Sequence, residues 1–202
     1  MEINKTELKI VNLFRRELFL ELSIRQLMRR LKSNSYQRVY EAANLLIKKN
    51  ILKFKKVGRT NQISLNFSRE TILLFSFLDE QEAKKIPNHE KILGIKEISD
   101  FIILVSGSYA AGRHTKKSDL DMIIIIPDKE DTVSIQKLVE NKTLLLKPEV
   151  HLYVFRKKDF TEMLLSKDEN YAKEIAKKRI MLKNAQLFYE LVKEAAEYGY
   201  KG

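Results

Sequence analysis

The sequence predicts an α+β protein built from two modules. A helical module that ends in a β-hairpin is expected over residues 1–67, and a mixed β-sheet with helices over residues 88–202, with a linking helix in residues 68–87. Three observations predict this organisation. Positive charge is concentrated in the first third of the chain, helix and strand periodicities follow one another there in a fixed order, and the remainder contains two strongly apolar strand-like runs.

The composition excludes several classes of protein. The 202 residues are 44 % hydrophobic, which is enough to bury a core in each of two small modules. Because the chain contains no cysteine, it can form neither a disulfide framework nor a thiolate metal site, and a cytoplasmic protein is expected. No apolar run approaches the roughly 20 residues that a membrane helix needs, so no membrane partner is expected.

The formal net charge of +11 is distributed unevenly. Residues 1–67 contain 15 Lys and Arg against 5 Asp and Glu, whereas residues 68–202 contain 23 against 22. Lysines that only keep a protein soluble would be spread evenly along the chain. A surplus confined to one module indicates that this module binds a polyanion.

Helical spacing of apolar residues predicts three helices in the first module. One covers residues 6–16, a second follows the N-cap candidate Ser23 and ends near residue 31, and a third begins at Ser35 and ends near residue 50. A short extended patch, residues 19–22, separates the first two helices. Residues 51–57 and 62–66 alternate as strands around a glycine turn, so they predict a hairpin with a basic tip.

The order helix, short strand, helix, turn, helix, hairpin is the layout of a winged helix-turn-helix. The stretch SIRQLMRRLKSNSYQRVYEAANLLIKKNILKFKKVGRTNQISLN, residues 23–66, resembles the version found in archaeal and bacterial regulators. The resemblance implies that this module binds DNA through the start of its third helix and the tip of its hairpin. The candidate DNA contacts are Ser35, Tyr36, Gln37, Arg38, Tyr40 and Arg59.

Residues 68–85 predict a helix whose apolar residues cover most of its circumference, and Pro87 marks its end. A helix of this kind is not tolerated as a solvated linker. We expect it to be buried against the flanking modules or against a second copy of the chain, which leaves a homodimer among the open arrangements.

Two apolar strands of the second module bring acidic residues with them. Residues 101–106 run into the turn Gly107-Ser108, and residues 118–126 open with two aspartates before an aliphatic run. Since side chains alternate along a strand, Asp119 and Asp121 share one face, roughly 7 Å apart. Two such carboxylates would repel each other and resist desolvation without a bound cation. Their hard oxygen ligands predict a site for Mg²⁺ or Mn²⁺, completed by substrate phosphates.

The turn Gly107-Ser108 complements the aspartates. A glycine lets a triphosphate approach the backbone, and a serine at the start of a helix offers donors to phosphate oxygens. A lone Gly-Ser and a lone Asp-x-Asp are both weak signals. Their conjunction around two apolar strands has few purely structural explanations and favours a nucleotide site.

The stretch GSYAAGRHTKKSDLDMIIII, residues 107–126, resembles the DNA polymerase beta superfamily of nucleotidyltransferases, most closely its minimal members. The resemblance covers about residues 90–190 and implies that Gly107 and Ser108 contact the phosphates of a nucleoside triphosphate, with ATP the expected one. It also implies that Asp119 and Asp121 are metal ligands and catalytic residues. Further candidate nucleotide contacts in the same stretch are Arg113, Lys116 and Ser118.

The chain departs from the family pattern at two positions. Ala111 stands where the family often has arginine, and His151 aligns best with the family's third carboxylate. Glu149 lies two residues earlier on the same face of the predicted strand and could substitute for it. Glu149 and His151 are therefore both candidate catalytic residues.

Three functions remain open from the sequence. The first is a DNA-binding enzyme that transfers a nucleoside monophosphate from a nucleoside triphosphate to an unknown acceptor. The second is a transcription regulator whose nucleotidyltransferase-like domain only senses nucleotide. The third is an antitoxin-like protein that nucleotidylates a partner and binds its own operator.

Overall fold

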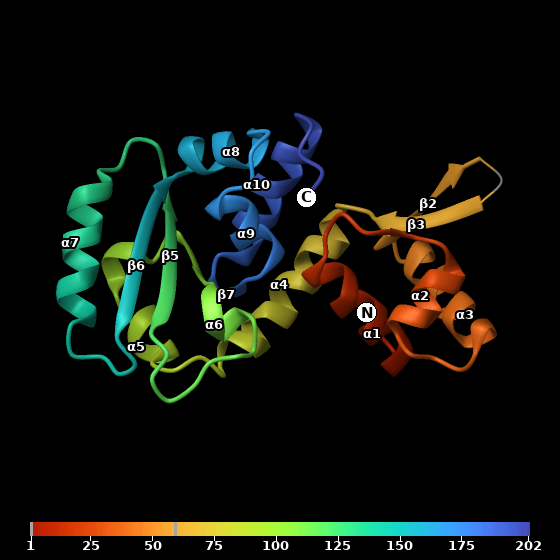
Figure 1. Cartoon of the computed structure of the whole chain (residues 1–202), viewed down its shortest axis with the longest axis horizontal. Helices are drawn as coiled ribbons and strands as arrows, with labels where there is room; N and C mark the ends of the chain where they lie inside the picture. Colours follow the sequence, from red (N-terminus) through yellow and green to blue (C-terminus); the bar gives the residue numbers. More distant parts are fainter. Residues whose placement is uncertain (1, 59) are drawn as a thin grey trace. The chain divides into compact units, whose positions relative to one another are not determined.

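The computed structural model describes residues 2–58 and 60–202. The chain divides into two compact units, one containing the residues up to Leu74 together with Gly202, and the other Phe75–Lys201 (Figure 1). Each unit combines helices with a β-sheet of its own, so the predicted α+β class is confirmed. Within the described ranges, no helix has both the length and the apolar character needed to cross a membrane.

The N-terminal unit contains three helices, a two-residue strand and a hairpin in the expected order. Its elements are α1 Lys5–Arg16, β1 Glu21–Leu22, α2 Ile24–Arg30, α3 Tyr36–Lys48, β2 Leu52–Val57 and β3 Thr60–Leu65. The strands form an antiparallel sheet in the order β1-β3-β2. The predicted wing-tip residue Arg59 lies outside the described residues.

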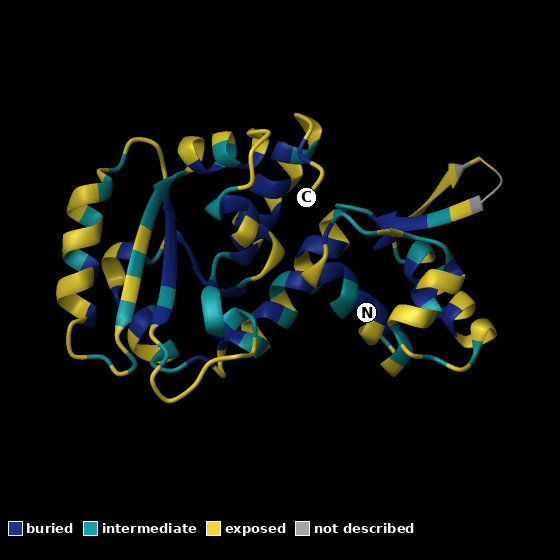
Figure 2. Ribbon diagram, in the orientation of Figure 1, coloured by how far each residue is buried: buried dark blue, intermediate teal, exposed yellow. Residues whose placement is uncertain are grey.

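Side-chain caps explain where α2 and α3 begin. The Ser23 hydroxyl accepts a hydrogen bond from the backbone N–H of Gln26, whose side chain reaches back to the Ser23 backbone and completes a capping box. The Ser35 hydroxyl accepts from the backbone N–H of Arg38 at 3.2 Å. Behind these caps, side chains such as Leu27 and Leu46 are fully buried, while the start of α3 is exposed (Figure 2).

Helix α4, Arg69–Ala83, is covered on only part of its surface within this chain. Ile72 and Phe75 are buried, but Leu73 is 50 % and Phe77 58 % exposed. Residues three or four positions apart share a helix face, so the exposed pair lies on a different face from the buried pair. One apolar face of α4 is therefore covered within this chain, and burial of the other face by a second copy stays a prediction.

The C-terminal unit places its sheet between two layers of helices. Its remaining elements are α5 His89–Leu93, the 3₁₀ helix η1 Lys96–Ile98, β4 Ile102–Val105, α6 Gly107–Ala110, β5 Leu120–Ile126, α7 Thr132–Thr143, β6 Val150–Arg156, α8 Lys157–Leu165, α9 Tyr171–Lys177, β7 Ile180–Lys183 and α10 Ala185–Glu197. The strand order is β6-β5-β4-β7, with β5 parallel to β6 and β4 antiparallel to both of its neighbours.

The central strand β5 determines which side chains reach the site. Leu120 and Met122 point to one face and belong to the core that also contains Ile92 of α5 and Val139 of α7. Asp121 alternates to the opposite face, on which α8, α9 and α10 carry an aromatic cluster that includes Phe160. A strand that is covered on both faces usually consists of apolar residues throughout, so an aspartate within β5 is unusual and indicates a functional role.

A candidate nucleotide site at the β4–α6 turn

Gly107 meets Asp121 at the end of β4. The Ser106 backbone N–H donates to the Asp121 carbonyl oxygen at 2.9 Å, which holds the turn against the start of β5. Gly107 has a φ of 62°, and a Cβ built on it would lie 1.9 Å from Oδ2 of Asp121. Both the backbone conformation and the lack of space therefore require glycine at this position.

The two aspartates lie at the entry of β5 with different environments. The side chain of Asp119, just before the strand, is 47 % exposed, and that of Asp121 is 26 % exposed. Burial raises the pKa of Asp121, and although the nearby His151 lowers it, the negative charges of Asp119 and Glu174 raise it further. The charged form of this carboxyl is therefore disfavoured in the folded protein, and a bound cation would stabilise it.

His151 lies beside both aspartates. It pairs with Asp121 in the parallel register of β5 and β6, so the two side chains share a face of the sheet. Its Nε2 is 3.9 Å from Oδ2 of Asp119, and its Nδ1 is 4.0 Å from Oδ1 of Asp121. These separations exceed hydrogen-bond length but leave the imidazole in electrostatic contact with both carboxylates.

Glu149, the other candidate for the third acidic group, precedes β6 and is exposed. Its backbone carbonyl oxygen accepts a hydrogen bond from the Leu120 N–H at 2.8 Å, which fixes the main chain at the start of the β5–β6 pair. The structure thus brings His151 to the aspartates by direct register and leaves the Glu149 side chain at the entrance of the strand.

A pocket of about 370 Å³ opens beside the turn. The residues that line it are Gly107, Ser108, Ala111, Arg113, Glu174 and Lys178. Three predicted nucleotide contacts therefore share one cavity. The other two predicted contacts, Lys116 and Ser118, do not line this pocket. The Ser118 hydroxyl instead accepts a hydrogen bond from the Thr115 backbone N–H at 2.9 Å, which closes the loop that contains both residues.

Helix α9 contributes side chains that sequence reasoning missed. The Tyr171 hydroxyl is hydrogen-bonded to the Ser106 hydroxyl at 2.8 Å, and burial raises its pKa. Its ring lies 5.0 Å from that of Tyr153 on β6. Glu174 and Lys178 reach the pocket from the same helix. The sequence marks a helix here through its cap Asn170, but no sequence signal indicates that this helix lies over the Gly107 turn.

The donor set fits a divalent cation that shares its coordination with a substrate. Among residues 2–58 and 60–202, no three acidic or histidine side chains form a group arranged to hold a metal ion by themselves. Mg²⁺ is commonly held by one or two carboxylates together with substrate phosphates and water. Asp119 and Asp121 provide two such carboxylates next to a pocket that could receive phosphates.

A model of the nucleotidyltransferase domain family matches residues 80–182, a little more than half of the chain. The chain belongs to the nucleotidyltransferase domain family. The match begins within α4 and ends within β7, so this nucleotidyltransferase domain includes the Gly107 turn, both aspartates and helix α9. Neither curated proteins nor solved structures gave a match.

Membership confirms the resemblance drawn from the sequence of residues 107–126 and makes a nucleoside triphosphate the substrate class of this nucleotidyltransferase domain. The match does not extend to the N-terminal unit, where the candidate DNA contacts lie on the exposed start of α3. There the rings of Tyr36 and Tyr40 stack with centroids 6.2 Å apart, and the Gln37 amide donates to Glu41 at 2.7 Å. Arg38 is exposed beside them.

Proposed function

We propose that this protein is a Mg²⁺-dependent nucleotidyltransferase that transfers a nucleoside monophosphate from a nucleoside triphosphate, with ATP the expected donor, to an acceptor hydroxyl. The observation that carries the proposal is the position of Gly107, which lines the pocket and whose missing side chain leaves room for the Asp121 carboxylate. Membership in the nucleotidyltransferase domain family supports it.

Each residue of the site has a role in this proposal. Gly107 and Ser108 bind the triphosphate with backbone N–H groups and the serine hydroxyl, and Arg113 offsets part of its charge. Asp119 and Asp121 hold the divalent cation. When bound, the cation would neutralise charge on the phosphates and on the leaving pyrophosphate. Mn²⁺ could replace Mg²⁺ because it also takes carboxylate and phosphate oxygens.

The reaction forms a bond between the acceptor oxygen and the α-phosphorus and breaks the bond to the oxygen that bridges the α- and β-phosphates. Pyrophosphate leaves, and the acceptor hydroxyl loses its proton. His151, within 4.0 Å of both aspartates, and Glu149, at the strand entrance, are the candidates to receive that proton or to orient the acceptor.

The test incubates the full chain with α-labelled ATP, Mg²⁺ and a fractionated cell extract as the source of acceptor. The doubly substituted variant Asp119→Asn, Asp121→Asn is expected to lose label transfer and Mg²⁺-dependent nucleotide binding while it stays folded. The charge-matched control is the double variant Asp168→Asn, Glu169→Gln, at two exposed sites in the loop before α9. Unchanged nucleotide affinity in the double variant would sink the proposal.

We infer that the N-terminal unit is a winged helix-turn-helix that binds DNA. The support is its order of elements, the capped start of α3 with exposed Tyr36, Arg38 and Tyr40, and an excess of positive charge in residues 1–67, which hold 15 basic and 5 acidic residues. In such modules the second helix of the motif enters the major groove while cations contact phosphates. The first measurement is an electrophoretic mobility shift assay, in which the protein is added to a DNA fragment that contains its own promoter and is expected to slow its migration.

A nucleotide sensor is the second candidate function, because the residue paired with Asp121 on β6 is His151 and not a carboxylate. A neutral imidazole is a poor ligand for a hard cation. If Glu149 supplies the missing acid, Glu149→Gln abolishes transfer and retains nucleotide binding, and His151→Asp changes little. If instead Glu149→Gln is silent and His151→Asp creates transfer, the native domain binds nucleotide without turnover.

We also propose two features of the organisation of this protein. The first is the division into modules at residues 1–67, 68–87 and 88–202, and the second is a homodimer. The exposed Leu73 and Phe77 on α4 are the residues through which we propose that two copies associate. Light scattering of the full chain and of Phe77→Ser tests this: a dimer that becomes a monomer supports it, and a monomeric native chain contradicts it.

A further inference from the structure

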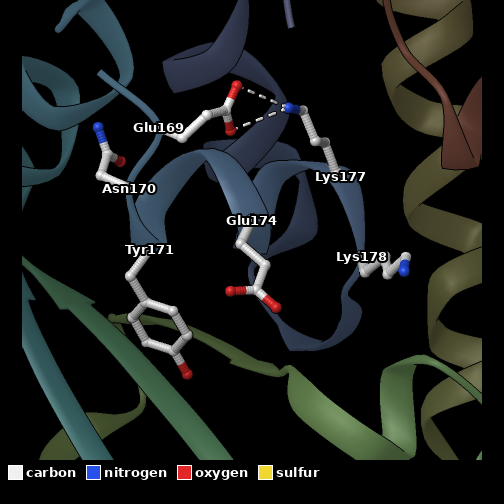
Figure 3. A pocket seen from close by; sticks show the side chains of 6 residues that line it. All are labelled: Glu169, Asn170, Tyr171, Glu174, Lys177 and Lys178. Atoms are coloured by element: carbon white, nitrogen blue, oxygen red, sulfur yellow. Dashed lines mark hydrogen bonds and ion pairs between the residues drawn. The ribbon is translucent and has the colours of Figure 1, made fainter.

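The pocket at the Gly107 turn has two walls, and only one belongs to the motif recognised from the sequence. The first wall is the segment from Gly107 to Arg113. The second is helix α9 with its C-cap Lys178, which adds one acidic and one basic side chain. A second pocket of about 500 Å³ lies along α9 and shares Glu174 and Lys178 with the first (Figure 3). These two residues therefore stand where the two pockets meet.

Helix α9 is held firmly enough to position these side chains. Its N-cap Asn170 accepts from the Lys173 backbone N–H, and Ile175 is fully buried beneath it. The Tyr171 hydroxyl is bonded to Ser106, the residue that directly precedes Gly107. Glu174 follows Tyr171 by three positions, so these two side chains lie on one face of the helix, whereas Lys178 is the C-cap residue with an extended backbone and reaches the pocket from the end of the helix.

The charged side chains on and beside α9 include one ion pair and two residues outside it. Lys177 contacts both carboxylate oxygens of Glu169, at 3.3 and 3.2 Å. Figure 3 shows this pair on one side of the helix and Glu174 pointing with Tyr171 to another. In the described part of the chain, neither the carboxylate of Glu174 nor the ammonium of Lys178 has a hydrogen bond or ion pair. Both can therefore engage a ligand in the pocket without breaking a contact.

We propose that Glu174 and Lys178 form the second wall of the nucleotide pocket, where Lys178 binds the terminal phosphates and Glu174 faces the divalent cation that accompanies them. This inference rests on the proposed function, since it assumes that the pocket receives a triphosphate. A lysine suits a triphosphate tail because its ammonium is a point charge that binds phosphate from any direction. A carboxylate beside the triphosphate would repel it unless a cation lies between them.

The test for Lys178 measures binding of ATP and of AMP to the full chain with Mg²⁺ by titration calorimetry. Lys178→Ala is expected to weaken ATP binding about 10- to 100-fold, the usual loss for a charge-assisted contact, and to leave AMP binding unchanged. Lys177→Ala removes the same charge from the neighbouring position and is expected to change ATP binding by no more than about twofold. Equal losses in the two variants would overturn the inference.

The test for Glu174 compares ATP binding with and without Mg²⁺. Glu174→Gln is expected to leave metal-free binding unchanged or tighter and to reduce the gain in affinity that Mg²⁺ gives, whereas Glu169→Gln leaves that gain unchanged. A gain unaffected by Glu174→Gln would overturn the assignment. If the native chain binds none of the four common nucleoside triphosphates, the proposed function fails; if it binds ATP and the α9 variants match their controls, only this inference fails.

Discussion

The start of α3 and the β4–α6 turn present their candidate ligand contacts in opposite ways. On α3 the side chains come from the start of one helix and are mostly exposed, and their contacts are local, such as the stacked rings of Tyr36 and Tyr40 and the hydrogen bond from Gln37 to Glu41. At the turn they come from two separate segments, residues 107–113 and the end of α9, and converge on a pocket, and one carbon atom added to Gly107 would collide with Asp121. The DNA binding that we propose for the first region would sum many small electrostatic contributions, whereas the nucleotide binding that we propose for the second would depend on shape complementarity.

This difference predicts how each region responds to change. A surface that binds through summed charge should lose affinity gradually with substitution and steeply with salt. A convergent site should fail at one substitution and tolerate a neighbouring one.

Gly107→Ala is expected to have the largest effect. Its Cβ would displace the Asp121 carboxylate, and a misplacement of about 1 Å in a catalytic site can lower the rate about 100-fold. Gly112→Ala is the control, since Gly112 also has a positive φ but no atom within 4 Å of an added Cβ. Both variants should lose about 1–2 kcal/mol of stability. Only Gly107→Ala should lose label transfer, and equal transfer in both would contradict the role of this contact.

The second-largest expected difference between the two regions is in how their ligand affinities depend on salt concentration. Binding of nonspecific DNA is expected to fall at least about 100-fold between 50 and 200 mM salt, because a protein that contacts several phosphates releases the condensed counterions. AMP binding to the C-terminal unit, measured over the same range, should change far less. DNA affinity that is insensitive to salt, or no DNA binding at all, would refute the winged-helix assignment.

Arg38→Ala should weaken binding to the promoter fragment about 5- to 100-fold, corresponding to the 1–3 kcal/mol of a groove contact. Lys129→Ala removes one positive charge from an exposed site in the other unit and should leave DNA affinity unchanged. Fluorescence anisotropy of labelled DNA provides the comparison. An equally large loss of DNA affinity in Lys129→Ala would show that DNA binding depends only on the total charge of the protein and not on Arg38.

The smallest effect concerns stability. The folded-state pKa of Asp121 is raised, mainly by burial, so ionisation of this carboxyl costs more in the folded than in the unfolded chain. Asp121→Asn should therefore raise the free energy of unfolding at neutral pH without metal. The gain should vanish as the pH falls below the ordinary aspartate pKa, where the native carboxyl is protonated in both states. Thermal melts across that range, with Asp168→Asn as control, test the sign.

Local features of the fold were readable from the sequence. Ser23 and Ser35 were expected to begin helices, and both accept the backbone hydrogen bonds that cap them. The Gly-Ser turn and the aspartates were recognised because strand alternation and backbone freedom act over a few residues. The family match over residues 80–182 bears out the family resemblance, and the roles of the turn and the aspartates stay predictions.

Features that depend on tertiary packing were not readable. Glu174 and Lys178 lie far along the chain from Gly107, and only the docking of α9 over the turn brings them to the pocket. The apolar pattern of α4 could not show that Leu73 and Phe77 would stay exposed, because periodicity describes a helix and not its neighbours. Alternation placed Glu149 and His151 on one face, but only the strand register pairs His151 with Asp121.

The pairing of Asp121 with His151 has a consequence for the history of the gene. Codons for aspartate and histidine differ in their first base alone, so one point mutation exchanges an imidazole for a carboxylate at this position. The exchange occurs on β6, an edge strand, where the His151 side chain is largely exposed and little packing has to be rebuilt. On the sensor alternative, in which His151→Asp creates transfer, a lineage acquires or discards turnover in a single step, and an enzyme and a sensor are adjacent genotypes.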